Sequence, residues 1–386
     1  MPPLSHPLVT RPMKTNTRLA YLDGLRGVAI LLVVLFHAYI RWPGIVPFGE
    51  RFAHVPFLQY GWVGVQLFFM ISGFVILMSL ERSKNIADFM LRRWLRLFPA
   101  MLIATILVCV TSPLLTDRPA GTLDPMNVVP GLLFIEPGWL NFILGTHFRA
   151  LEGPFWSLFV EVKFYLIFGS LYFAFGARKA ISLLFALFSV TVFFKLYMIK
   201  HPHAQAVIYW TNFALKRTSA EHFGWFTFGA ILYLHLRNRS LYTIIAAFGA
   251  AAISVAVFNG SHLIEKIPPA LMVLLFSAAI TNDKVQHFLQ RKAWLTLGFV
   301  SYPLYLIHEN AVVSLTAQFG QFWPSIPAAI LPIGPIAFLF CVAWLIAAYG
   351  EPAVRRLLQP AHRRASEIIA THWLARSQQS RKASDA

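Results

Sequence analysis

Two side chains that can do chemistry flank the first apolar stretch of this sequence. Arg26 precedes the stretch and His37 ends it, with ten residues between them, nine of them strongly apolar when Ala29 is counted. On a helix, eleven steps of about 100° bring both side chains to one face, roughly 16 Å apart along the axis. The spacing therefore predicts a cation and an imidazole at two depths of one membrane-spanning helix.

The composition indicates a membrane protein. Of 386 residues, 57% are hydrophobic and 13% are charged, whereas soluble domains have about 45–50% apolar and about 25% charged residues. The formal net charge of +17 would suggest a nucleic-acid partner in a soluble protein. In a membrane protein it is typical of Lys and Arg kept in cytoplasmic loops, so we expect no nucleic-acid partner.

Ten apolar segments predict an all-α, polytopic bundle of about ten transmembrane helices. The segments cover residues 24–40, 61–80, 97–115, 155–175, 181–199, 222–236, 241–258, 267–282, 296–317 and 329–350. A further run at 127–145 is broken by Pro130 and Pro137. That run suits a re-entrant or interfacial piece, or an eleventh span.

The distribution of Lys and Arg orients this bundle. With both termini in the cytoplasm, the inner segments carry 23 of these residues and the outer loops carry 8, as the positive-inside rule requires. We therefore expect a cytoplasmic segment at 1–18, a membrane domain at 19–352 and a basic cytoplasmic tail at 353–386. The tail suits either a helix lying on anionic lipid or a disordered, solvated segment.

Polar residues within the predicted spans are functional candidates because their burial in a membrane is costly. Three of them fall at a similar depth, in the outer half of the membrane: His37, Glu161 and His308. Ser157 and Tyr165 share the helix face of Glu161, and Tyr305 shares that of His308. A histidine beside a carboxylate suits proton removal from a hydroxyl. Glu161 is a better candidate than Asp23 for orienting His37, because Asp23 lies near the inner end of its span.

Three arginines fall on the predicted cytoplasmic side: Arg26, Arg93 and Arg96. Such a basic mouth suits the phosphates of a nucleotide cofactor. Purely structural roles are the alternative. The histidines would then be buried residues with their hydrogen bonds satisfied, and the arginines would anchor helix ends or set the membrane topology. No HExxH or Cys/His metal-binding spacing occurs, so we expect no metal.

Six sequence blocks occur in the order found in a known family. They are RLAYLDGLRGVAILLVVLFHAY, which contains Arg26 and His37, GWVGVQLFFMISGFVI at 61–76, RRWLRLFPA at 92–100, FWSLFVEVKFYL at 155–166, SYPLYLIHE at 301–309 and YGEP at 349–352. Over about residues 19–352 the chain thereby resembles the membrane acyltransferase-3 family. Members of that family O-acylate bacterial surface glycans and some small molecules.

The resemblance implies a multi-pass protein of the bacterial inner membrane, in the stand-alone form without a fused extracytoplasmic domain. It implies a cytoplasmic acyl-CoA donor, usually acetyl-CoA, and an acceptor on the far side. His37 matches the proposed catalytic histidine, Arg26 its partner, and Arg93 and Arg96 the arginines that serve the donor. Glu161 matches the carboxylate of its block and His308 a histidine of less settled role. Gln66 and Lys163 stand where the family is often acidic.

The leading hypothesis is therefore an integral-membrane O-acyltransferase that moves an acyl group to a hydroxyl of a polysaccharide or lipid-linked saccharide. His37 would be the general base. A proton-coupled transporter or exporter is the rival reading, because buried His and Glu also occur in carriers. A membrane scaffold for polysaccharide synthesis is a third.

Overall fold

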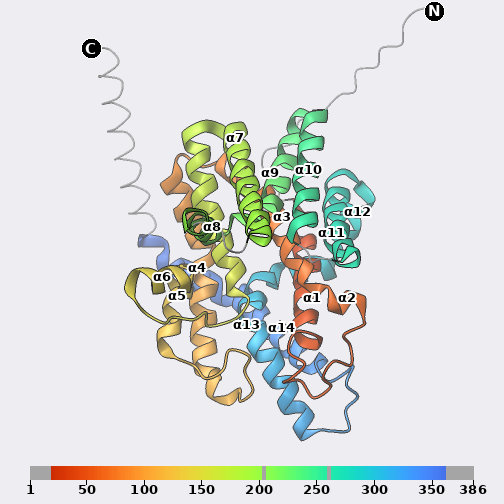
Figure 1. Cartoon of the computed structure of the whole chain (residues 1–386). Coiled ribbons are helices and arrows are strands. Elements are labelled where there is room, and N and C mark those ends of the chain that lie inside the picture. Colours follow the sequence, from red (N-terminus) through yellow and green to blue (C-terminus); the bar gives the residue numbers. More distant parts are fainter. Residues whose placement is uncertain (1–18, 202–205, 259–261, 362–386) are drawn as a thin grey trace, which may run out of the picture.

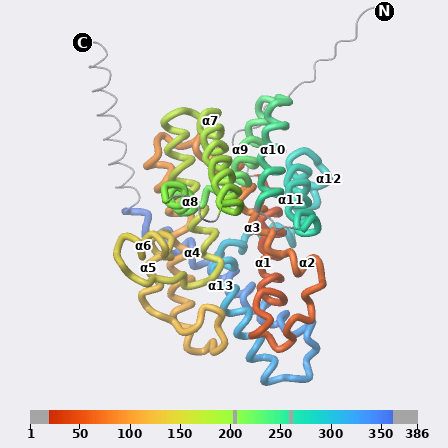
Figure 2. The backbone as a smooth tube through the Cα atoms, in the orientation of Figure 1, coloured from red at the N-terminus to blue at the C-terminus, as the bar shows by residue number. Residues whose placement is uncertain are grey.

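The computed structural model of the chain describes residues 19–201, 206–258 and 262–361. Across these described residues the chain is helical, with no strand (Figures 1 and 2). The longer helices are α1 (Ala20–Tyr39), α3 (Gly64–Leu80), α4 (Ile86–Thr111), α7 (Phe155–Lys200), α8 (Ala206–Thr218), α9 (Phe223–Asn238), α10 (Leu241–Phe258), α11 (Leu263–Thr281), α13 (Lys292–Phe322) and α14 (Ile333–Leu345). The predicted segment 1–18 and the tail beyond residue 361 lie outside the described residues.

The all-α class is confirmed, but the count of ten spans is not. Within the described residues, six helices are long and apolar enough to cross a membrane: α1, α3 with the turn before it, α4, α7, α11 and α14 with its extension to Ala361. Two predicted spans fall in α7, which is broken at Gly176 (φ 79°, ψ 168°) and folds back there (Figure 1). Helices α9 and α10 are short, and the apolar sequence of the continuous helix α13 is interrupted by buried polar residues. The cytoplasmic placement of both termini stays a prediction.

The region predicted at 127–145 forms two short helices, α5 (Val128–Leu133) and α6 (Pro137–Leu144). Their axes, with the turn before α5, are bent by 109°, which is the geometry of a broken span or a re-entrant loop. Pro137 begins α6, where the missing N–H of proline costs no hydrogen bond. Two prolines thus prevent this stretch from forming one straight helix.

Helices α1 and α13 approach each other closely through two glycines. A Cβ on Gly298 would collide with the backbone carbonyl oxygen of Asp23, and one on Gly27 with that of Trp294. Small residues at such positions let two helix backbones touch. Beyond this contact the two helices run on together, and both carry a histidine ten residues further along, at His37 and His308.

Gly298→Ala is expected to lower the free energy of unfolding by about 1–3 kcal/mol, because the added methyl group meets backbone rather than a movable side chain. The measurement is the thermal unfolding midpoint of the protein in lipid or detergent. Gly249→Ala in α10 is the matched control, since a Cβ there meets no atom within 4 Å. Equal midpoints for the two variants would contradict the close helix contact.

Candidate active site

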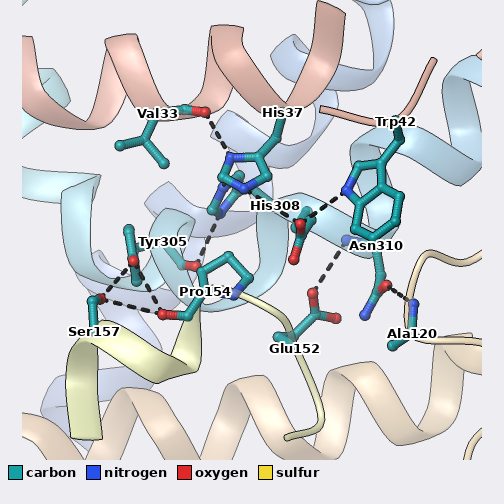
Figure 3. A network of polar contacts seen from close by, with 11 residues as sticks. Val33, His37, Trp42, Ala120, Glu152, Pro154, Ser157, Tyr305, His308 and Asn310 are labelled. Carbon is teal, nitrogen blue, oxygen red and sulfur yellow. Dashed lines mark hydrogen bonds and ion pairs between the residues drawn. The ribbon is translucent and has the colours of Figure 1, made fainter. Parts of the chain in front are cut away.

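His37 of α1 and His308 of α13 contact each other where the two helices pack (Figure 3). Nδ1 of His37 lies 3.3 Å from Nε2 of His308, and the rings meet edge to face with centroids 4.9 Å apart. His308 is fully buried, while the His37 side chain is 14% exposed. The small exposed fraction makes His37 the member of the pair that a substrate can reach.

Backbone carbonyl groups fix one proton on each of the two rings. The carbonyl oxygen of Val33 lies 2.9 Å from Nδ1 of His37, and that of Tyr305 lies 2.9 Å from Nδ1 of His308. Because a carbonyl oxygen only accepts, each Nδ1 carries a proton and donates it. Nε2 of His308 is then an acceptor for His37. Nε2 of His37 faces Oε1 of Glu309, and it is the basic atom whenever the ring is neutral.

The carboxylate that contacts His37 is Glu309. Its Oε1 lies 3.3 Å from Nε2 of His37 and accepts a hydrogen bond of 2.9 Å from Nε1 of Trp42. The sequence interpretation gave this position to Glu161, which lies on α7 and in the structure contacts Ser72 and Tyr165. The contact of α1 with α13 at Gly27 and Gly298 aligns His37 with the end of the block SYPLYLIHE instead. A glutamate within the predicted span 296–317 was itself the overlooked signal.

Glu161 belongs to a neighbouring cavity, which we call the arginine cavity. Oε1 of Glu161 accepts hydrogen bonds from the hydroxyls of Ser72 (2.5 Å) and Tyr165 (2.6 Å). The polar lining of the cavity is Arg26, Ser72, Arg93, Arg96, Ser157, Glu161, Tyr165, Ser301, Tyr302 and Tyr305. The structure thus gathers seven predicted site residues around one space: Arg26, Arg93, Arg96, Ser157, Glu161, Tyr165 and Tyr305.

The three arginines of this cavity are each held by a neighbour. Arg26 pairs with Asp23 at 2.8 Å, so Asp23 positions that guanidinium rather than His37. The nearest ion-pair partner of Arg96 is Glu351, at 3.6 Å, in the YGEP block. Arg93 donates to the hydroxyl of Ser79, but its Nε is buried and has no hydrogen-bond partner among the described residues. Positive charge therefore remains available to an anionic ligand.

Ser157 and Tyr305 connect the arginine cavity to the histidine pair. Their hydroxyl oxygens are 2.6 Å apart, so one of them donates to the other, and both lie within hydrogen-bond distance of the carbonyl oxygen of Pro154 (Figure 3). The ring of Tyr305 lies 5.6 Å from that of His308 between centroids. Ser157 is thus engaged by two partners, a poor arrangement for a nucleophile.

A second cavity, which we call the loop cavity, reaches Glu309 from the connections around residues 118–127 and 149–153. Its lining is Trp42, Arg118, Pro119, Ala120, Thr122, Leu123, Asp124, Asn127, Arg149, Ala150, Leu151, Gly153 and Glu309. Asn310 fastens both connections to α13: its Oδ1 accepts from the amide of Ala120 (2.9 Å), and its Nδ2 donates to the carbonyl of Leu151 (3.3 Å). Each cavity is thus lined by one neighbour of the histidine pair: the arginine cavity by Tyr305, beside His308, and the loop cavity by Glu309, beside His37.

Gly153→Ala is expected to lower kcat about tenfold or more, because the new methyl group would occupy the place of the Glu309 carboxylate. That carboxylate is fixed by His37 and Trp42, so it has to leave His37 when it moves. The measurement is the rate of the acyl transfer expected from the sequence, divided by the amount of folded protein. Gly44→Ala, where a Cβ meets no atom within 4 Å, should keep the rate of the unaltered protein; a similar loss in both variants would contradict the Glu309 contact.

The arrangement can bind an anion, remove a proton and exchange it with a carboxylate. Glu309 can stabilise an imidazolium on His37 through Nε2, whereas the carboxylate of a hydrolase triad contacts the ring nitrogen that does not take the proton. Among the described residues, no group of three or more His, Cys, Asp or Glu side chains is placed to hold a metal ion. The chemistry open to these side chains is therefore acid–base chemistry on a substrate that reaches His37.

Comparison with known proteins gives a family match. A family model for an acyltransferase domain matches residues 19–349. O-acetyltransferase OatA of Staphylococcus aureus is 24% identical over 337 residues, covering 78% of this chain and 51% of the relative. Peptidoglycan O-acetyltransferase OatA of Listeria monocytogenes is 26% identical over 171 residues, covering 40% of this chain and 25% of the relative. No solved structure matches the chain.

This chain spans about half the length of its Staphylococcus relative. The family model, by contrast, matches most of this chain. The matched residues include α1, α3, α4, α7 and α13, which carry the two histidines and the lining of the arginine cavity. Together with its apolar helices, this match makes the protein a multi-pass membrane protein. The chain belongs to the acyltransferase-3 family.

Proposed function

We propose that this protein is an O-acyltransferase of the bacterial inner membrane that moves an acetyl group from cytoplasmic acetyl-CoA to a hydroxyl of a cell-surface or exported saccharide. One observation carries the proposal: the His37–His308 pair adjoins Tyr305 of the arginine cavity and Glu309 of the loop cavity. This arrangement supports a donor in one cavity and an acceptor in the other.

The donor is assigned to the arginine cavity. Arg26, Arg93 and Arg96 supply positive charge for the phosphates of CoA. The thioester end then lies toward Tyr305 and the histidine pair. Glu161, which the sequence marked as catalytic, contributes here through its hydrogen bonds to Ser72 and Tyr165, and His308 holds the ring of His37.

The acceptor hydroxyl is assigned to the Nε2 side of His37, where the loop cavity reaches Glu309. The hydroxyl oxygen attacks the thioester carbonyl carbon while its proton passes to Nε2. The C–S bond then breaks, and the departing sulfur takes that proton from the imidazolium. The products are an acetyl ester and free CoA, and His37 returns to its neutral state.

The test uses inverted membrane vesicles that contain the protein, supplied with acetyl-CoA labelled in the acetyl group. We expect label to enter a glycan fraction in step with CoA release, and vesicles without the protein to show neither. Label that stays in acetyl-CoA, in the presence of the native envelope glycans, would contradict the proposal. Proton-coupled transport of a glycan without acyl transfer would favour the carrier instead.

A further inference from the structure

Arg118 is a buried cation without a direct partner in the part of the chain that the structure describes. Its residue is 7% exposed, and its Nε is buried with no hydrogen-bond partner. Within residues 19–201, 206–258 and 262–361, the side chain makes no ion pair either. A buried charge is costly unless it is paired, so this guanidinium is set up for a partner that arrives with a ligand.

Glu152, a buried acid whose pKa Arg118 influences, does not supply the missing charge. Burial raises the pKa of Glu152 to about 8, and the neighbouring charge of Glu309 raises it further, against the lowering effects of Asn310 and Arg118. Glu152 is therefore mostly protonated at neutral pH, and its Oε2 accepts from the amide of Asn310 at 3.2 Å. Its carboxyl group serves the backbone beside the site rather than Arg118.

The other charged groups that line the loop cavity are one arginine and two acidic residues, and neither acidic residue is paired with Arg118. Arg149 lines the cavity and is exposed. Asp124 is exposed to solvent and accepts from the amide of Met126 at 2.9 Å. Glu309 is tied to His37 and Trp42. The cavity thus contains two arginines and two carboxylates. The Asp124 carboxylate is exposed to solvent, and the Glu309 carboxylate is bound by His37 and Trp42.

We propose that the loop cavity recognises an anionic group, a carboxylate or a phosphate, on the saccharide acceptor, and that Arg118 is the residue that binds it. This inference rests on the proposed function, because it assigns the acceptor to this cavity. Since Glu309 lines the same cavity and contacts His37, the anionic group lies close to the hydroxyl that is acylated. Arg149, at the exposed part of the lining, adds attraction for the same group.

The experiment uses the full-length protein in vesicles, labelled acetyl-CoA, and glycans from the envelope of cells that naturally make the protein. One portion of glycan is untreated, one has its carboxylates reduced to alcohols, and one has its phosphate esters removed with cold aqueous hydrofluoric acid. We expect one of the two treatments to lower kcat/KM about tenfold or more. The treatment that does so identifies the source of the anion.

Variants separate recognition from folding. Arg118→Gln is expected to raise the KM for untreated glycan about 10- to 100-fold, with the KM for acetyl-CoA unchanged, and to lose the preference for untreated over treated glycan. Arg118→Lys should restore part of this preference. Arg51→Gln, at an exposed arginine outside the cavity lining, should behave as the unaltered protein. If Arg118→Gln does not fold, the glycan treatments still decide with the unaltered protein.

Equal transfer to untreated and to both treated glycans would overturn the anion site while leaving the acyltransferase intact. A preference that survives in Arg118→Gln would overturn the role of Arg118. Absence of transfer to any glycan, together with absence of CoA release, would instead overturn the proposed function and this inference with it.

Discussion

His37→Ala is expected to lower kcat for acetyl transfer by about 10²–10⁴-fold, which is the usual contribution of a general base. The physical reason is that Nε2 of His37 is the basic atom left after both Nδ1 groups donate to carbonyl oxygens. The KM for acetyl-CoA should change little, because the arginine cavity remains whole. The measurement is labelled acetyl transfer and CoA release at saturating donor.

His54→Ala is the matched control, since His54 is an exposed histidine in the connection after α1. It should retain the full rate. His37→Gln adds a second check, because an amide fills similar space without a basic nitrogen and should be as inactive as the alanine variant. A His37→Ala protein that folds and keeps its rate would remove His37 from the chemistry.

Glu309→Gln should also lower kcat by about 10²–10⁴-fold, by analogy with removal of the carboxylate that supports a catalytic histidine. The amide keeps the size of the side chain but cannot stabilise an imidazolium on His37. Glu161→Gln is the informative comparison, because its carboxylate contacts Ser72 and Tyr165 in the arginine cavity. We expect that variant to raise the KM for acetyl-CoA, with a smaller effect on kcat.

A double-variant cycle tests whether Glu309 acts through His37. If it does, Glu309→Gln should cost little more once His37 is already alanine, because residues that work as a unit are not additive. Losses that multiply in the double variant would show that Glu309 works independently. A larger loss of kcat in Glu161→Gln than in Glu309→Gln would return the supporting role to Glu161.

The sequence was sufficient to predict which side chains share one face of a helix. The apolar runs predicted helices, and the Arg26–His37 spacing placed both residues on α1 with Arg26 in the arginine cavity. The i, i+3 spacing of Arg93 and Arg96 placed both on the lining of that cavity. The stripe of Ser157, Glu161 and Tyr165 also lines it.

Features that depend on two helices could not be predicted in this way. Glu309, and not Glu161, is the neighbour of His37 because α1 and α13 approach each other closely. The relative alignment of two helices cannot be read from the residue spacing within either one. Length was a second difficulty: the residues on either side of Gly176 each predicted a span, yet they join in one bent helix. Arg118 lay in a loop, where a lone cation carries no periodic signal.

The glycine contact between α1 and α13 also constrains how this protein can evolve. Gly27 and His37, like Gly298 and His308, are ten residues apart. On each helix, the same number of residues therefore separates the glycine contact from the histidine. Inserting one residue into either interval would rotate its histidine by about 100° and shift it by about 1.5 Å. Insertions and deletions are therefore expected to accumulate in the connections between helices and to be absent from 27–37 and 298–308, where chain length itself is under selection.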